Sequence, residues 1–145
     1  MEYFGNRGAG VLPVSRESRK CLIALRSDWV MEPRTWGIWG GKIDDGEVSP
    51  KDAALRELFE ETGYTGNVSL YEAYVYKDKN FQYYNFFGLV DSEFEPDLNW
   101  ETSDYRWFSF DELMDLEPKH FGLRALLNDK KSLDLLKKLT KKSDF

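Results

Sequence analysis

Three glutamates, Glu57, Glu60 and Glu61, lie close together in residues 40–64, "GGKIDDGEVSPKDAALRELFEETGY". The pattern predicts a helix over residues 50–62, and at about 100° per residue the three carboxylates fall within an arc of roughly 100°. Like charges at this spacing destabilise an isolated helix by only about 0.2–0.5 kcal/mol per pair. A solvated acidic face therefore tolerates the repulsion, and a bound cation relieves it. The spacing by itself favours the solvated face.

The loop in front of this helix shifts the interpretation towards a cation site. Gly40, Gly41 and Gly46 let the backbone come close to a ligand, and Glu47 lies in the same loop. A glycine-rich approach, clustered carboxylates and the neighbouring Arg56 suit the binding of divalent cations against a phosphate chain.

Both ends of the predicted helix carry capping residues. Ser49 is a capping hydroxyl, Pro50 suits the first helical position, and Asp52 places a negative charge in the first turn. Gly63 supplies a left-handed residue just past the end. Two pairs of apolar residues spaced four apart, Leu55 with Phe59 and Ala54 with Leu58, predict the stripe that packs on a sheet.

With these residues in place, the sequence resembles the Nudix hydrolase family. The family signature reads Gly, five residues, Glu, seven residues, Arg-Glu, an aliphatic, any residue, Glu-Glu, any residue, Gly, and an aliphatic or aromatic residue. It spans residues 41–64, and the matching positions are Gly41, Glu47, Arg56, Glu57, Leu58, Glu60, Glu61, Gly63 and Tyr64. The chain departs from it once, because eight residues (48–55) separate Glu47 from Arg56. We assign the extra residue to Val48, where a loop can bulge without rotating the helix.

The resemblance implies a fold and a reaction. The fold is a mixed α/β (α+β) domain, an α/β/α sandwich with mixed and antiparallel sheet and a loop–helix–loop motif. The reaction is hydrolysis of a nucleoside diphosphate linked to another group, X. The implied magnesium ligands are Glu57, Glu60 and Glu61 with the Gly41 carbonyl, while Arg56 holds a glutamate and Glu47 orients Arg56.

The resemblance leaves the general base open among Glu61, Glu57 and a carboxylate from outside the helix. Glu101, in "LNWETSDYRW", is the preferred outside candidate and Glu93 the weaker one. For the substrate, Arg26 resembles a position that touches the nucleotide or its phosphates in some members, and a surface Arg is the alternative.

A substrate base could also stack on a ring in the glycine-broken loop that contains Trp36 and Trp39, beside Gly40 and Gly41. Inward packing is the more common role of such bulky rings.

The elements that must position these residues follow from the apolar patterns. Residues 9–15 and 20–27 read as early strands, 67–78 and 81–91 as a hairpin, and 104–110 as a further strand. Helical patterns follow over 111–116, 120–128 and the Lys- and Leu-rich C-terminal segment. This order predicts helices covering a mostly antiparallel or mixed sheet.

Composition narrows the functional class. A chain of 145 residues with 41% hydrophobic and 32% charged residues predicts a single domain over 1–145 and contains no membrane span. The start of the chain lacks a secretory pattern, so a cytoplasmic address is expected. The single cysteine, Cys21, is predicted to be a buried strand residue. The single histidine, His120, argues against a His-rich zinc site and against a Ser-His-Asp triad. Oxygen ligands then favour Mg²⁺, with Mn²⁺ as an alternative.

Several alternatives remain open. A nucleoside triphosphate, including an oxidised one, is the favoured substrate, with ADP-ribose, nucleotide sugars and dinucleoside polyphosphates as the others. A nucleotide-binding sensor without catalysis is the alternative from another class. A related isoprenoid diphosphate isomerase is disfavoured because Cys21 is poorly placed for catalysis. The net charge of −6 argues against an extended nucleic-acid partner, and the aromatics of residues 83–87 leave a homodimer open.

Overall fold

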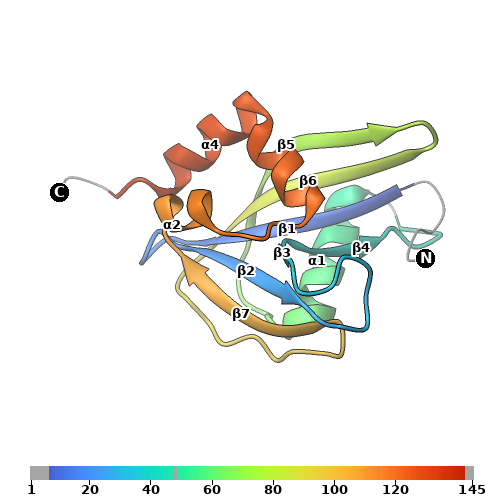
Figure 1. Cartoon of the computed structure of the whole chain (residues 1–145), viewed down its shortest axis with the longest axis horizontal. Helices are drawn as coiled ribbons and strands as arrows, with labels where there is room; N and C mark the ends of the chain where they lie inside the picture. The colour runs from blue at the N-terminus through green and yellow to red at the C-terminus, as the bar shows by residue number, and fades with distance from the viewer. Residues whose placement is uncertain (1–6, 48, 143–145) are drawn as a thin grey trace.

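The structure, a computed structural model, describes residues 7–47 and 49–142. Along these residues strands come first, one helix and more strands follow, and three helices end the order, as the apolar patterns predict (Figure 1). The elements are β1 (Arg7–Ser15), β2 (Cys21–Arg26), β3 (Trp36–Gly37), β4 (Trp39–Lys42), α1 (Pro50–Thr62), β5 (Ser69–Asp78), β6 (Phe81–Val90), β7 (Thr102–Phe108), α2 (Phe110–Asp115), α3 (Phe121–Asn128) and α4 (Lys130–Thr140).

The strands form one mixed sheet. Its main path runs β3-β2-β1-β6-β5, with β4 paired to β1 and β7 paired to β2. The central pair, β1 and β6, is parallel from Arg7 opposite Gln82 to Ser15 opposite Val90, while the other pairs are antiparallel. The predicted hairpin is confirmed as β5 and β6, and the predicted mixed sheet is confirmed with it.

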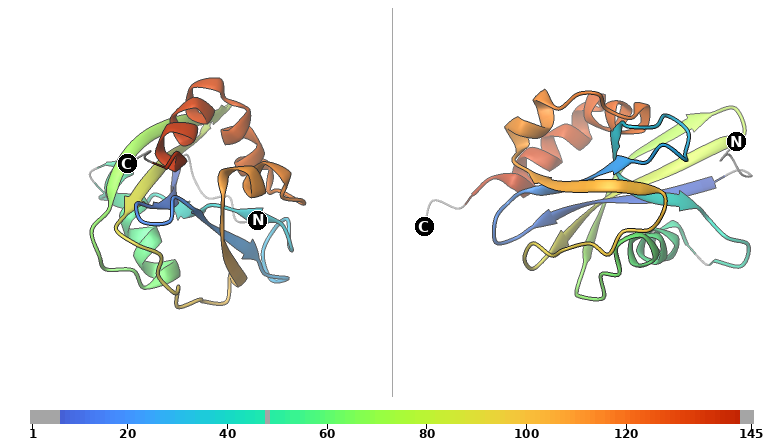
Figure 2. Two further views of the ribbon diagram at one scale, coloured as in Figure 1. Left: turned by 90° about the vertical axis from the view of Figure 1, so that its left-hand side faces the viewer. Right: turned by 60° about the horizontal axis from the view of Figure 1, so that its bottom comes forward.

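Helices cover both faces of this sheet. In Figure 2 (right), α1 lies on one side of the strands and α2, α3 and α4 lie on the other, which confirms the predicted sandwich. Alternate residues of β1 serve the two cores because successive side chains of a strand point to opposite faces. Val11 packs in the core that contains Leu58 of α1, and Leu12 packs in the core that contains Leu123 and Leu136 of α3 and α4.

The glycine-rich stretch around the two tryptophans forms strands, which corrects the expectation of a loop. Trp39 is fully buried, and its Nε1 donates to the Leu22 carbonyl at 3.1 Å. At Gly40, a Cβ would lie 2.4 Å from the Ala9 carbonyl oxygen. Glycine is needed there for close strand pairing, so the glycines that suggested a loop instead permit β4.

α1 has the predicted ends but a different buried face. Ser49 accepts a hydrogen bond from the Asp52 amide at 3.2 Å, and Gly63 closes the helix with φ 74°. The expected packing of Leu55 and Phe59 on the sheet is wrong, since they are 39% and 53% exposed. The buried residues of α1 are Ala53, Ala54, Leu58, Glu61 and Thr62. Two small alanines let the helix approach the sheet closely, and this rotates Leu55 and Phe59 outwards.

The remaining expectations for packing are met. Cys21 is fully buried in β2, and α4 buries Leu136 and Leu139 against the sheet side. In residues 83–87, Phe86 and Phe87 are buried, so these two rings fill the core rather than offering a dimer surface. None of the described helices is both long and apolar enough to span a bilayer.

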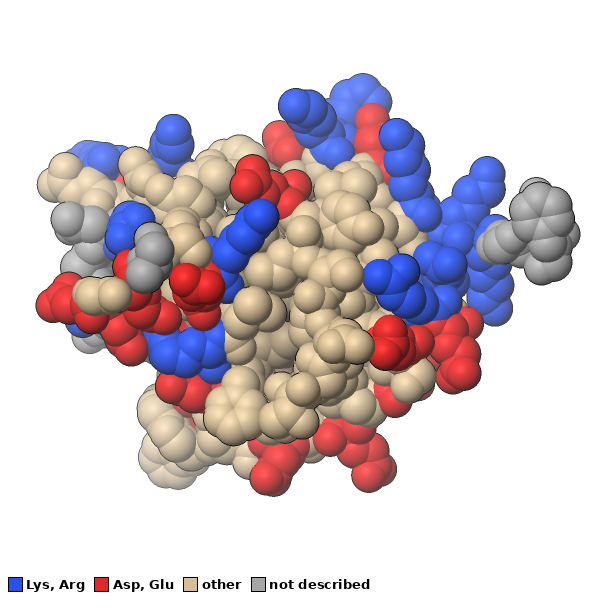
Figure 3. Space-filling view, turned by 180° about the vertical axis from the view of Figure 1, so that it is seen from behind, with Lys and Arg blue, Asp and Glu red and all other residues tan. Residues whose placement is uncertain are grey.

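The outward side of α1 carries charged as well as apolar residues, with Lys51, Asp52 and Glu60 exposed. Figure 3 views the molecule from this side and shows a broad uncharged area in the middle, with Lys and Arg gathered towards the end where α4 terminates. The exposed Leu55 and Phe59 contribute to the apolar character of this side.

Candidate active site

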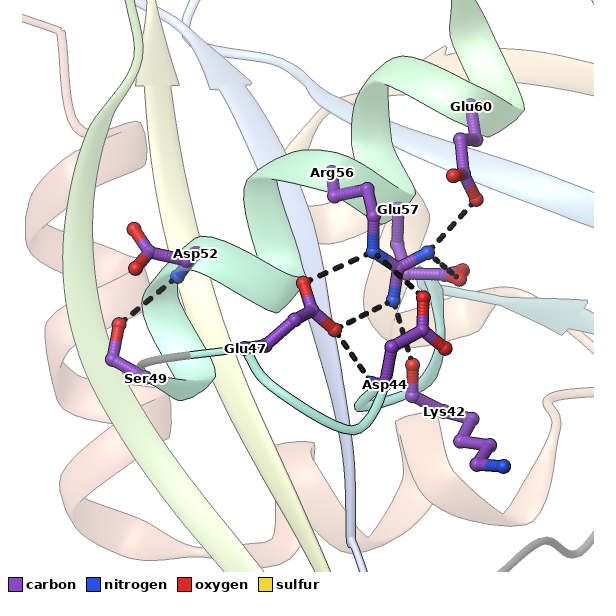
Figure 4. Close-up of polar contacts among 8 residues, drawn as sticks. All are labelled: Lys42, Asp44, Glu47, Ser49, Asp52, Arg56, Glu57 and Glu60. Atoms are coloured by element: carbon purple, nitrogen blue, oxygen red, sulfur yellow. Dashed lines mark hydrogen bonds and ion pairs between the residues drawn. The ribbon is translucent and has the colours of Figure 1, made fainter.

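Arg56 organises the acidic segment from the middle of α1. Its Nε and Nη2 donate to the two carboxylate oxygens of Glu47, both at 3.0 Å, and Nη2 also donates to the Lys42 carbonyl at 2.8 Å. Its Nη1 donates to Glu57 at 3.1 Å and to Glu60 at 2.9 Å (Figure 4). One planar guanidinium therefore joins the loop after β4 to two helix carboxylates, which a flexible ammonium could not do with the same geometry.

The loop between β4 and α1 is closed by Glu47. This side chain accepts from the Asp44 amide at 2.6 Å as well as from Arg56. The hydrogen bond from Arg56 lowers the pKa of Glu47, and the carboxylates around Arg56 raise the pKa of the guanidinium. Both groups are thus held in their charged forms. The extra residue that we assign to Val48 lies outside the described residues.

Glu57 and Glu61 form a close pair on the sheet side of α1. Glu61 is 7% exposed and accepts from the Gly40 amide at 3.2 Å. The side chain of Glu57 is 13% exposed. Burial raises the pKa of each, and the negative charge of Glu57 raises the pKa of Glu61 further. This pair carries an unfavourable charge that a cation would neutralise.

The residues present fit such a cation. A Cβ at Gly41 would lie 2.6 Å from the Glu57 Oε2 atom, so the bare backbone of β4 packs directly against the carboxylate. Glu60 differs, because its side chain is 52% exposed and bonded to Arg56. Among the described residues no three acidic, His or Cys side chains gather into a preformed metal site. Glu57, Glu61 and the Gly41 backbone are therefore the part of the predicted ligand set that lies together.

Of the two candidate carboxylates outside α1, Glu101 lies just before β7. Its backbone carbonyl accepts from the Ser27 amide at 2.9 Å, and its charge contributes to the raised pKa of Glu61. Glu93 is exposed and does not contribute to that shift. The fold thus brings Glu101, from a separate segment of the chain, towards the Glu57 and Glu61 pair.

The comparisons with known proteins identify the family of this chain. The model of the NUDIX domain matches residues 6–129, most of the chain. The chain belongs to the Nudix family. It is 35% identical over 105 residues to a putative 8-oxo-dGTP diphosphatase of Bacillus subtilis, covering 71% of this chain and 66% of that protein. It is 33% identical over 101 residues to the m7GpppN-mRNA hydrolase dcap-2 of Caenorhabditis elegans, covering 63% of this chain but only 12% of that protein.

Solved structures of Nudix proteins share the fold of this chain. A Nudix hydrolase from M. smegmatis superposes with a TM-score of 0.74 at 22% identity, over 92% of this chain and 88% of the other. At that identity the likeness shows the fold. The chain spans less than two thirds of the length of these curated relatives, at 66% of the diphosphatase and 12% of the mRNA hydrolase.

The predicted substrate residues of this Nudix domain differ in how close they lie to the site and in how exposed they are. The Nε of Arg26, at the end of β2, donates to the Met31 carbonyl at 2.9 Å. Trp36 is half-buried and packs edge-to-face on Phe108, with ring centroids 5.2 Å apart. Trp39 lies in the core, so the idea that its ring stacks on a base is wrong. Gly40 borders the site directly through its amide bond to Glu61.

Sequence reasoning missed Tyr83 of β6. A Cβ at Gly10 or Gly40 would lie 2.4 Å or 2.1 Å from its hydroxyl, so the phenol lies across β1 and β4 where glycines leave room. Burial raises the pKa of Tyr83, and the charges of Glu61 and Glu57 raise it further. Only the parallel register of β1 and β6, which sets Gly8 opposite Tyr83, brings this ring to the site.

Proposed function

We propose that this chain is a pyrophosphohydrolase that uses Mg²⁺, or Mn²⁺ in its place, to cleave a phosphoanhydride bond in a nucleoside diphosphate linked to a group X. The observation that carries the proposal is the pair of the half-buried Glu57 and the buried Glu61, with Glu57 against the bare backbone of Gly41. Two carboxylates in this setting bind a hard cation well and repel an unaccompanied polyphosphate.

The residues take the following roles in this proposal. Glu57, Glu60 and Glu61 with the Gly41 carbonyl hold the cation, which when bound neutralises phosphate charge and favours attack by water. Arg56 positions Glu57 and Glu60, and Glu47 holds Arg56 in place. Glu101 takes the proton of the attacking water, because it is the carboxylate that approaches the pair from outside the helix.

The proposed substrate is a small nucleotide. The relative named as an 8-oxo-dGTP diphosphatase supports a nucleoside triphosphate, including an oxidised one, cleaved to monophosphate and pyrophosphate. The proposed substrate-binding residues lie in β2, β3 and β4 and are Arg26, Trp36, Gly40 and Gly41. One sheet shared by both cores supports a single domain over residues 1–145, and the cytoplasmic address stays a prediction.

Product analysis tests the proposal. The purified chain is incubated with Mg²⁺ and a panel of nucleoside triphosphates, oxidised deoxynucleotides, ADP-ribose and nucleotide sugars, and the products are separated by anion exchange. We expect cleavage that needs Mg²⁺, is lost in Glu61→Gln and is retained in Glu72→Gln, a control at an exposed position on β5. Tight nucleotide binding without turnover of any compound would replace the enzyme with a nucleotide-binding sensor.

A further inference from the structure

Two of the five tryptophans have no place in the core. Trp39 is buried, Trp36 packs on Phe108, and the Nε1 of Trp107 donates to the Phe94 carbonyl at 3.2 Å. Trp29 and Trp100, in contrast, are 81% and 65% exposed. Within the described part of the chain, neither ring contacts another aromatic ring. Leaving two of the largest apolar side chains in water is unfavourable unless they bind something.

The two exposed rings come from loops that meet. Trp29 lies in the loop between β2 and β3, and Trp100 lies in the turn before β7. The Ser27 amide donates to the Glu101 carbonyl at 2.9 Å, so residues two positions from Trp29 and one position from Trp100 are bonded to each other. The separation of these residues in the sequence gives no hint of this proximity.

Both loops are held in shape by their own hydrogen bonds. The Trp29 amide donates to the Ser27 hydroxyl at 3.2 Å, and the Arg34 amide closes the loop on the Arg26 carbonyl at 2.9 Å. On the other side, the Glu101 amide donates to the Asn99 side chain at 2.9 Å, which forms the turn that carries Trp100. Backbone ordered before binding lowers the entropic cost of holding a ligand.

This meeting point lies next to the proposed phosphate site. The Asp97 amide donates to the Thr62 carbonyl at 2.8 Å, so the segment that leads into the Trp100 turn is bonded to the residue that follows Glu61. The turn that carries Trp100 therefore adjoins the end of α1 where Glu61 lies. The strand ends that carry these loops lie together at one edge of the molecule in Figure 1.

The geometry points to a stacking site: we propose that Trp29 and Trp100 bind a planar aromatic ring in the X group of the substrate, such as the second base of a dinucleoside polyphosphate. The inference rests on the proposed function, because it places the phosphates at the glutamates. Exposed tryptophans bind any flat ring through its π face, and each stacked base contributes about tenfold or more to binding.

A protein partner fits this patch less well. Besides the two tryptophans, the exposed large apolar residue of these loops is Met31, at 51%. A standard protein interface needs roughly 20–30 residues on each side. A small flat ligand is matched to the area that two indoles offer.

A matched substrate pair tests the inference. Diadenosine diphosphate and ADP-ribose share the ADP half and differ at one position of the second ribose, where adenine replaces a hydroxyl. Both are assayed with Mg²⁺ for the wild type, Trp29→Ala, Trp100→Ala and the conservative variant Trp29→Phe. The control is Tyr71→Ala, an exposed aromatic on β5, at the far side of the sheet from β7.

We expect each alanine variant to lose about tenfold in kcat/KM for diadenosine diphosphate and to keep its kcat/KM for ADP-ribose. Trp29→Phe should retain most of the activity, and Tyr71→Ala all of it. Equal losses on both substrates, or no loss on either, would overturn the stacking site and leave the hydrolase intact.

A binding measurement decides the inference even without turnover. Tryptophan fluorescence of the Glu61→Gln chain is titrated with each compound. We expect diadenosine diphosphate to quench more strongly than ADP-ribose, and this difference to vanish in the Trp29→Ala, Trp100→Ala double variant. Equal quenching by the two compounds, or a difference that survives in the double variant, rejects the stacking site. Absence of hydrolysis with the expected quenching would reject only the proposed activity.

Discussion

At the scale of single residues, Arg56 does more than a surface charge could. It makes five hydrogen bonds, to one backbone carbonyl and three carboxylates, while its side chain is 25% exposed. Most surface ion pairs contribute little because water screens them and the side chains lose freedom. Here the planar fork fits several acceptors at once, so its value is geometric: it sets where Glu57 and the loop of Glu47 lie.

Replacing Arg56 with lysine tests this geometric role. The ammonium keeps the charge but cannot reach Glu47 through two parallel bonds, so we expect activity to fall by roughly 10–100-fold. Steady-state kinetics at several Mg²⁺ concentrations measure the loss. The control is Arg16→Lys, at an exposed residue 3.9 Å from Asp91, which should leave the rate unchanged. Wild-type activity in Arg56→Lys would show that charge alone is sufficient.

The thiol of Cys21 gives a second prediction at this scale. Burial raises its pKa from 9.0 to about 12, so the folded chain should resist iodoacetamide at pH 8 and react only after denaturation. Above pH 9 the unfolded thiol loses its proton while the folded thiol keeps it, so stability should fall as the pH rises towards 12. Mass spectrometry of labelled native and denatured protein measures the reactivity. Rapid labelling of the native chain would contradict the buried placement.

At the scale of elements, α1 combines two tasks on one short helix. Its caps and its small residues dock it on β1 and β4, and its buried side includes Glu61 as well as Leu58. Placing a carboxylate in the docked face orients it towards the Gly40 amide but gives up an apolar contact. The exposed Leu55 and Phe59 show that the helix is positioned by Ala53, Ala54 and Leu58, not by its largest apolar side chains.

Alanine substitution on α1 separates the two faces. Leu58→Ala removes a side chain that is 1% exposed and should lower the free energy of unfolding by about 2–5 kcal/mol. Phe59→Ala removes a larger ring from the outward face and should change it by about 0.5 kcal/mol or less. Urea denaturation of both variants gives the comparison. A larger loss for Phe59→Ala would restore the stripe that the sequence suggested.

At the scale of the whole molecule, the site is assembled from distant segments: the β4 edge, α1 and the turn before β7. The repulsion between Glu57 and Glu61 therefore lowers the free energy of unfolding of the whole domain, and a bound cation raises it again. Because one sheet joins both cores, cation binding at α1 should stabilise the whole domain.

Thermal unfolding with Mg²⁺ and with a chelator measures the coupling. We expect Mg²⁺ to raise the Tm of the wild type. Without metal, Glu61→Gln should have a higher Tm than the wild type. The glutamine side-chain oxygen still accepts from the backbone N–H of Gly40, and the substitution removes a buried charge. Mg²⁺ should then stabilise this variant little. A lower Tm for metal-free Glu61→Gln would contradict the view that the carboxylate pair is strained.

Local sequence determined much of this protein. The caps Ser49 and Gly63, the spacing of the glutamates after Arg56 and the β5–β6 hairpin all depend on contacts within a few turns or residues, where periodicity is decisive. Tertiary structure alone decided which face of α1 is buried, that residues 36–42 form strands, that Tyr83 lies beside the site, and that the loops of Trp29 and Trp100 meet. Those outcomes depend on strand register and on the close approach of backbones far apart in the chain, and no local period records either.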